Sequence, residues 1–402
     1  MTVYSVVFVI TLLCVSTIVS EDVTNERRSH RVWNRLTGKI ADRYNIDNRH
    51  LNDEAMLLFS DVAFQSLNDS KTWNVMVHGW RYQNNHRRDW FGFGASHWLQ
   101  RLGRNLINPD DILYLNGSIN HDRLRPFFVV DRKNENIEFN IGSITQTIET
   151  DRHGEFYEKI QVPSDVIQTL KRQQNKGNII TYEAAGEDDK NLTGITHLIE
   201  PSQGISIISD IDDTIKISEV LDKVRLLANT FISPFKPVAG MPELYREWNE
   251  KNKDLTFHYL SGMPDQLYTL TQEFINTNRF PDGSFHMRHF GWAATSLFNF
   301  LHSTSTFIHK IRYLHFFLSN TIRDFVLIGD SGEKDPEIYG TVAREYPERI
   351  RAIFIRAIQG ESFNDQRFID AFEGVPREKW LIFNDPKQVP IDLSRAPKTI
   401  PK

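Results

Sequence analysis

A chain of 402 residues is long enough to form two domains with separate hydrophobic cores. Its apolar content of 40% and charged content of 25% are ordinary values for a globular protein. The formal net charge of −5 excludes a general nucleic-acid-binding protein, because there is no basic excess to neutralise a phosphate backbone.

Residues 1–20 predict a secretory signal peptide. Residues 2–20 carry no charge and are mostly apolar, and a strongly polar segment follows from Glu21. No Lys or Arg precedes the apolar run, and the run approaches bilayer-spanning length, so an uncleaved signal anchor is the alternative. Both interpretations predict a protein that is secreted or lumenal in the secretory pathway.

Export through the secretory pathway would affect cysteine residues and the asparagines of N-glycosylation triplets. The only cysteine, Cys14, lies inside the predicted signal, so the mature chain is expected to contain no disulfide bond. Three Asn-x-Ser/Thr triplets, at Asn68, Asn116 and Asn191, become candidate N-glycosylation sites.

Residues 21–53 predict a polar N-terminal arm, and residues 54–202 predict a β-rich domain. In the second range, short runs of strand character alternate with turn residues, and no strong amphipathic helix separates them. This spacing predicts a small β-sandwich or barrel, with a sandwich-like fold preferred. The expected strands are 73–80, 127–130, 137–141, 156–162 and 179–183. Residues 82–104 are richer in aromatic side chains and Arg, and they predict a helical insertion.

Residues 203–386 predict an α/β domain, because strands and helices alternate along them. Alternation of this kind indicates a doubly wound parallel sheet with helices on both faces. Expected strands are 205–209, 255–260, 325–328 and 350–355, and expected helices are 242–251, 265–276, 306–318 and 336–345. Residues 380–383 are expected to close the domain, and residues 387–402 to form a loose C-terminal tail.

Acidic residues follow the first strand of this α/β domain: Asp210, Asp212 and Asp213, with the hydroxyl of Thr214. Open α/β sheets bind ligands at the carboxyl ends of their strands. Two carboxylates two residues apart favour Mg²⁺, which prefers oxygen ligands, and an Asp placed there can also attack phosphorus. An Asp-x-Asp-x-Thr pattern alone is also common in loops and helix caps, so it needs support from the rest of the chain.

That support comes from three later positions. Ser261 ends the second expected strand, where its hydroxyl and a helix N-terminus can contact phosphate oxygens. Lys310 lies on the helix before the third strand and supplies a cation. Asp330 and Asp335 follow the third strand after Gly329, at a spacing that can reach a metal bound by Asp210. Separately, these residues are typical of an N-cap, a solvated lysine and an acidic turn; together and in this order they indicate one site.

These positions resemble the four motifs of haloacid dehalogenase superfamily phosphatases. More narrowly, the amino-acid sequences of residues 209–215, 259–264 and 327–339 are similar to those of the phosphatidate phosphatase family of the yeast actin-patch protein. The resemblance covers about residues 204–385, and residues 73–80 and 154–163 also resemble that family's N-terminal region.

The resemblance implies a role for each residue. Asp210 would be the nucleophile and a Mg²⁺ ligand, and Asp212 would be the general acid/base, with its backbone carbonyl facing the metal. Thr214 would orient the loop. Ser261 and Lys310 would hold the phosphoryl oxygens. Asp330 would complete the metal site, and Asp335 is a further candidate ligand.

The family implies a Mg²⁺-dependent phosphatidate phosphatase that forms an aspartyl-phosphate and releases diacylglycerol. The expected partner is phosphatidate or a similar lipid phosphate, with peripheral membrane contact. No nucleic-acid partner is expected, and the sequence does not identify protein partners. Apolar residues in 221–235 and 297–301 could form a lipid-facing surface or an ordinary packed helix. A secreted phosphomonoesterase on a soluble substrate and a non-catalytic lipid-phosphate-binding protein remain alternatives, because the yeast family member acts inside the cell.

Overall fold

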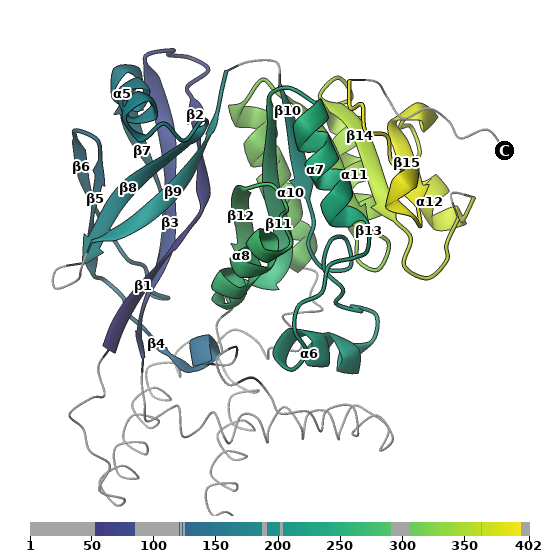
Figure 1. Ribbon diagram of the computed structural model, residues 1–402, viewed down its shortest axis with the longest axis horizontal. Helices are drawn as coiled ribbons and strands as arrows, with labels where there is room; N and C mark the ends of the chain where they lie inside the picture. Colours follow the sequence, from purple (N-terminus) through teal and green to yellow (C-terminus); the bar gives the residue numbers. More distant parts are fainter. Residues whose placement is uncertain are drawn as a thin grey trace, which may run out of the picture.

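The computed structural model describes residues 53–84, 120, 123, 125–186, 191–201, 204–290, 305–362 and 364–394. In these ranges a β-rich region and a parallel α/β domain lie side by side (Figure 1). The predicted signal peptide, nearly all of the polar arm, most of the predicted helical insertion and residues 297–301 lie outside the described residues. None of the helices described there is long and apolar enough to cross a membrane.

The β-rich region consists of one sheet rather than two. Its longest strand, β3, pairs with β1 and β2 on one side and with β4 and β7 on the other, and the path continues from β2 through β9, β8 and β5 to β6. The described strands are β1 (Asp53–Phe59), β2 (Asp61–Gln65), β3 (Thr72–Asn84), β4 (Val130–Asp131), β5 (Asn136–Ile141), β6 (Ile144–Glu149), β7 (Glu155–Pro163), β8 (Ile179–Gly186) and β9 (Leu192–Ile199).

This sheet curls around a single core. Alternate residues of β5 and β8 are buried, so that Phe139 and Tyr182 point inward against Val75 and Val77 of β3. The β character of the region was therefore predicted correctly, but the preferred two-sheet sandwich is wrong. Because strand pairing is decided by partners far apart in the chain, turn spacing alone does not distinguish one curled sheet from two packed sheets.

Two further expectations about this region are wrong. A helix, α5 (Ser164–Gln174), follows β7 and buries Ile167 and Leu170 against the sheet, although no strong helix was expected here. The expected strand at 127–130 begins as a short 3-10 helix, η4 (Arg125–Phe128), and only its end forms β4. Both segments are short, so the tertiary packing outweighs their weak local patterns.

The α/β domain contains a parallel six-stranded sheet in the order β12-β11-β10-β13-β14-β15. The chain begins in the middle with β10, builds outward to β12, and then returns to place β13 on the other side of β10. The strand order therefore reverses between β10 and β13, where ligands bind in sheets of this kind. The strands are β10 (Ile205–Ser209), β11 (Leu255–Pro264), β12 (Gly283–Arg288), β13 (Asp324–Asp330), β14 (Ile350–Arg356) and β15 (Trp380–Phe383).

Helices cover both faces of this sheet, as the sequence predicted (Figure 1). Ile207 of β10 and Val326 of β13 pack on one face with α7 and α8. Their neighbours Ile208 and Leu327 pack on the opposite face with α10, α11 and α12. The helices are α6 (Lys223–Phe231), α7 (Met241–Lys251), α8 (Tyr268–Thr277), α10 (Ser305–Asn320), α11 (Asp335–Glu345) and α12 (Gln366–Ala371), and a 3-10 turn, η5 (Asp265–Leu267), precedes α8.

The two regions contact each other through β12, the edge strand of the parallel sheet. The Phe285 amide of β12 donates to the carbonyl of Ser60, the residue that joins β1 to β2, at 2.8 Å. The Ser60 amide in turn donates to the Tyr268 hydroxyl at 3.0 Å, and Phe59 packs in the same core as Tyr268. The curled sheet is therefore joined to the α/β domain by both hydrogen bonds and a shared core.

The start of the predicted loose tail is part of the fold. Val389 and Leu393 are buried in the core that contains α7, and the Trp248 indole donates to the Pro390 carbonyl at 2.9 Å. The prediction of a loose tail is therefore wrong for residues 387–394. Val389, Ile391 and Leu393 alternate along the chain, but three apolar residues beside prolines are too short a pattern to predict burial from the sequence.

We expect Leu393→Ala to lower the free energy of unfolding by about 2–5 kcal/mol, because it opens a cavity at a side chain that is 1% exposed. Chemical denaturation monitored by tryptophan fluorescence measures this change. Leu67→Ala, at a side chain that is 54% exposed, is the matched control and should change stability by about 0.5 kcal/mol or less. Equal effects of the two substitutions would contradict the packing of this segment.

Candidate active site

The carboxyl ends of β10 and β13 bring the predicted acidic residues together. The Asp210 amide donates to the Ile328 carbonyl at 2.9 Å, which extends the pairing of β10 with β13 by one residue. Asp210 therefore stands beside Gly329 and Asp330 at the point where the strand order reverses. The buried apolar strands fix these positions, and the polar residues begin where the strands end.

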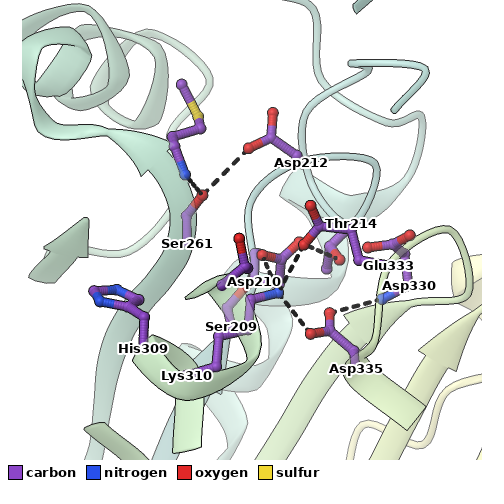
Figure 2. A network of polar contacts seen from close by, with 12 residues as sticks. Ser209, Asp210, Asp212, Thr214, Ser261, His309, Lys310, Asp330, Glu333 and Asp335 are labelled. Carbon is purple, nitrogen blue, oxygen red and sulfur yellow. Dashed lines mark hydrogen bonds and ion pairs between the residues drawn. The ribbon is translucent and has the colours of Figure 1, made fainter. Parts of the chain in front are cut away.

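Lys310 is the centre of the site. It reaches the strand ends from α10, and its Nζ lies 2.8 Å from Asp210 Oδ1 and 2.5 Å from Asp335 Oδ1. Glu333 Oε2 is a third neighbour at 3.2 Å. Figure 2 shows the ammonium between these three carboxylates. The side chain is fully buried, and although burial opposes its charge, the three acids hold the pKa of Lys310 well above its usual value.

Asp210, Asp330 and Asp335 form a candidate metal centre. One carboxylate oxygen from each lies within 4.8 Å of the other two, and all three residues are buried. Asp330 Oδ2 is buried and has no hydrogen-bond partner among the described residues. Burial, followed by the neighbouring acids, raises the pKa of Asp330 well above its usual value. Lys310 contacts three carboxylates, those of Asp210, Asp335 and Glu333, and Asp330 adds a fourth to the cluster. This donor set fits a hard divalent cation such as Mg²⁺.

Glycine at position 329 allows Asp335 to approach. A Cβ atom on Gly329 would lie 2.2 Å from Asp335 Oδ2 and 2.7 Å from its Cγ, which is closer than atoms can pack. Asp335 is the first residue of α11, where Pro336 follows it, and its Oδ2 accepts a hydrogen bond from the Asp330 amide at 3.3 Å. Glycine at position 329 is therefore required sterically, because it leaves room for Asp335 beside Asp330.

The loop after β10 is held by Thr214 and Asp213. The Thr214 hydroxyl donates to Asp210 Oδ2 at 3.0 Å, so it orients the carboxylate that Lys310 contacts on its other oxygen. Asp213 has a positive φ of 54°, and its carboxylate accepts the amides of Ser218, Glu219 and Val220 at 2.7–2.9 Å. The third acid of the cluster therefore shapes the loop.

Asp212 points away from the metal candidates. Its Oδ1 lies 2.7 Å from Lys216 Nζ and accepts the Ser218 hydroxyl at 2.5 Å, while its Oδ2 accepts the Ser261 hydroxyl at 3.2 Å (Figure 2). Burial favours the protonated form, but Lys216 and the two hydroxyls hold the pKa of Asp212 below its usual value. The sequence resemblance assigns the metal contact of Asp212 to its backbone carbonyl rather than to its side chain. That contact stays a prediction.

Two residues of the site were missed in the sequence. Glu333 contacts Lys310, and its only signal was its place between Asp330 and Asp335. Lys216 is fully buried and pairs with Asp212, and its signal was a charged residue between two isoleucines, four positions after an acid. The predicted site residues Asp210, Thr214, Lys310, Asp330 and Asp335 are brought together, and Ser261 joins them through Asp212.

The predicted lipid-facing stretch after the site divides into two parts. Leu226, Leu227 and Phe231 on α6 are buried, as in an ordinary packed helix. Leu221 and Ile217, in the loop that joins Asp213 to α6, are exposed. The helix itself therefore offers little apolar surface, and exposed apolar side chains in this stretch occur only beside the site loop. The second such stretch, 297–301, lies outside the described residues.

Carboxylates, hydroxyls and a buried ammonium at the switch point of a doubly wound sheet have the features of a phosphohydrolase site. Residues 205–357 match the family described as phosphatidate phosphatase APP1, catalytic domain. The resemblance to that phosphatidate phosphatase family, drawn from the sequence, is confirmed for this segment.

Two yeast proteins are similar to part of this chain. The phosphatidate phosphatase APP1 of Saccharomyces cerevisiae is 31% identical over 209 residues, which cover 50% of this chain and 32% of the relative. An uncharacterized protein of Schizosaccharomyces pombe is 35% identical over 164 residues, which cover 39% of this chain and 26% of the relative. The similarity thus spans a third or less of each yeast protein.

Among solved structures, a carbohydrate acetylesterase from Xanthomonas citri aligns with this protein. The alignment covers 83% of this chain and 68% of the acetylesterase chain. Its sequence identity of 9% and TM-score of 0.27 are too low to indicate a shared fold.

We expect Lys310→Met to lower the free energy of unfolding by about 3–5 kcal/mol, because it leaves buried carboxylates without their cation. Urea denaturation in the absence of divalent cations measures the effect. Lys334→Met is the matched control: its side chain is exposed, and its one ion pair among the described residues is a 3.7 Å contact to Glu337, so its effect should be about 1 kcal/mol or less. A Lys310→Met protein as stable as the control would contradict the buried charge network.

Proposed function

We propose that this protein is a Mg²⁺-dependent phosphatidate phosphatase with a haloacid dehalogenase-like catalytic domain. The observation that carries the proposal is the buried set of Asp210, Asp330 and Asp335 around Lys310, at the switch point of a sheet that matches the phosphatidate phosphatase family. These groups combine a nucleophile, a set of metal ligands and a fixed positive charge. Mg²⁺ bound by the three aspartates would reduce the repulsion between an anionic nucleophile and an anionic phosphate ester.

Asp210 is the proposed nucleophile. Its Oδ1 contacts Lys310 and its Oδ2 contacts Thr214, so both oxygens are oriented before the substrate arrives. Burial raises the pKa of Asp210, and Lys310 opposes this shift. An Asp210 oxygen bonds to phosphorus, the bond to the glycerol oxygen breaks, and an aspartyl-phosphate remains. Lys310 and the Ser261 hydroxyl, which lie on either side of this carboxylate in Figure 2, would hold the phosphoryl oxygens.

Asp212 is the proposed general acid and base. In its observed position, Lys216, Ser218 and Ser261 favour the carboxylate form, which suits removal of a proton from the attacking water. Protonating the leaving glycerol oxygen needs the acid form. A turn of Asp212 away from Lys216 would remove the contact that opposes that form, so the two roles correspond to two positions of one side chain.

A lipid phosphate is the proposed substrate, and peripheral contact with a membrane follows from it. Support comes from the family match and from exposed Ile217 and Leu221 beside the site loop. A soluble phosphomonoester is the second candidate, because most apolar residues of α6 are buried. Equal activity on short-chain soluble esters and on bilayer phosphatidate would favour that candidate. Binding of phosphatidate without turnover would indicate a non-catalytic binding protein.

We expect purified protein to release phosphate from phosphatidate in mixed micelles with Mg²⁺ and to be inactive with excess EDTA. Asp210→Asn should abolish release, because the nucleophile is lost with almost no change in volume. Lys310→Met should slow release by roughly 10²-fold or more, as for the loss of one preorganised charge contact. Asp165→Asn, at an exposed position on α5, should retain wild-type activity. Near wild-type turnover by Asp210→Asn, or full activity in EDTA, would contradict the mechanism.

Hydrolysis of an aryl phosphate without hydrolysis of phosphatidate would preserve the chemistry and refute the lipid assignment.

We further propose that the protein is secreted or lumenal in the secretory pathway. Asn68 and Asn191, each in a glycosylation triplet, are exposed in the structure. Expression in secretory cells should therefore give a product whose mass falls after removal of N-glycans, and Asn68→Gln with Asn191→Gln should reduce that change. An unglycosylated, cytosolic product would contradict export.

A further inference from the structure

A second cluster of metal-binding side chains lies between the curled sheet and the α/β domain. His78 from β3 and Glu155 from β7 come from the curled sheet. Asp265, at the start of η5, and His289, directly after β12, come from the α/β domain. None of these four residues belongs to the site around Lys310.

The four side chains converge. One ring nitrogen of His78 and one oxygen each of Glu155 and Asp265 lie within 4.8 Å of one another. His289 Nδ1 lies 3.0 and 3.1 Å from the two oxygens of Asp265 and 3.7 Å from Glu155 Oε1. Two imidazoles and two carboxylates therefore share a small volume, and three of the four residues are at least nine-tenths buried at the side chain.

His78 has an unused ring nitrogen. Its side chain is buried, and its Nδ1 has no hydrogen-bond partner among the described residues. The nearest acidic atom to this nitrogen is Asp61 Oδ2 at 3.9 Å, which is also buried and lacks a hydrogen bond within the described part of the chain. The ring is held by Phe59 and Tyr157, with centroids 4.5 and 5.0 Å away. An unpaired polar atom in a fixed, buried ring is unfavourable unless a ligand or water satisfies it.

The charges of the cluster also favour a cation. His78 Nδ1 has no hydrogen-bond partner among the described residues, and burial lowers the pKa of this ring to about 4. Burial is also the main cause that raises the pKa of Glu155, and Asp265, Asp151 and Asp131 add to it. His289 lies against Asp265 and Glu155, which outweigh burial and raise the pKa of His289 to about 9.

We propose that His78, Glu155, Asp265 and His289 bind a divalent transition-metal ion of the zinc type, which connects the curled sheet to the α/β domain. Two imidazole nitrogens and two carboxylate oxygens match the ligands and the coordination number of zinc, whereas Mg²⁺ prefers oxygen ligands alone. Two carboxylates would neutralise the charge of the ion.

The site would stabilise a functionally important turn. Asp265 follows β11 by one residue and lies four positions after Ser261, and His289 lies at the end of the neighbouring strand β12. A metal at the cluster would fix these two strand ends against β3 and β7. This inference does not depend on the proposed phosphatase activity, because binding is measured without turnover.

The test uses the full chain, stripped of metal with a chelator, and Zn²⁺ as the probe. Competition with a chromophoric chelator gives the Zn²⁺ affinity, and Co²⁺ substitution reports four-coordinate geometry through visible absorption. The measurements are made in the Asp330→Asn background, which removes one ligand of the Asp210 cluster. We expect about one equivalent of Zn²⁺ to bind in this background, and the unfolding temperature to rise on binding.

Glu155→Gln and His289→Ala should each weaken Zn²⁺ binding by about tenfold or more and remove the Co²⁺ absorption. Glu155→Gln is the safer variant, because it keeps the size of a side chain at the domain boundary. His315→Ala is the matched control: its ring is exposed and contacts only Glu345 at 2.7 Å among the acids described, so its affinity should not change. Absence of Zn²⁺ binding in the Asp330→Asn background, or equal affinity in Glu155→Gln and His315→Ala, would overturn the proposal.

Discussion

The buried ammonium of Lys310 is the interaction on which the site depends. Its Nζ lies 2.8 Å from Asp210 and 2.5 Å from Asp335, in a place where an unpaired carboxylate would be costly. Its ammonium contacts three carboxylates, and Asp330 keeps an oxygen without a hydrogen bond in the described structure. The same excess of negative charge that would weaken the fold is the feature on which the proposed binding of a divalent cation and a phosphate ester rests.

The parallel sheet supplies the rigidity that such a cluster requires. Pairing of β10 with β13 places Asp210 next to Gly329, and the missing Cβ of that glycine admits Asp335. On the other side, the Asp213 carbonyl accepts a hydrogen bond from Arg356 at 2.6 Å, which ties the loop after β10 to the end of β14. Neighbouring strands thus fix the proposed nucleophile, the proposed metal ligands and the loop that carries Asp212.

The α/β domain was predictable because its signals are local. Buried β-branched runs followed by acids predict strand ends, and Asp210, Lys310, Asp330 and Asp335 meet because parallel strands end at one edge. The curl of the β-rich sheet, the buried Leu393 and the pairing of Asp212 with Lys216 depend on contacts that spacing does not encode. For the same reason, the cluster of His78, Glu155, Asp265 and His289 has no signature along the chain, since its members come from four separate elements.

The most direct measurement of the central claim is a search for a phosphoryl group on Asp210. Asp212→Asn would be mixed with an aryl phosphate and Mg²⁺, quenched in acid and analysed by peptide mass spectrometry. An aryl leaving group needs little protonation, whereas hydrolysis of the intermediate needs the Asp212 base, so the account predicts phosphorylated Asp210 in this variant. Its amount should fall when EDTA replaces Mg²⁺. Turnover with the phosphoryl group on another residue, or with none on Asp210, would contradict the account.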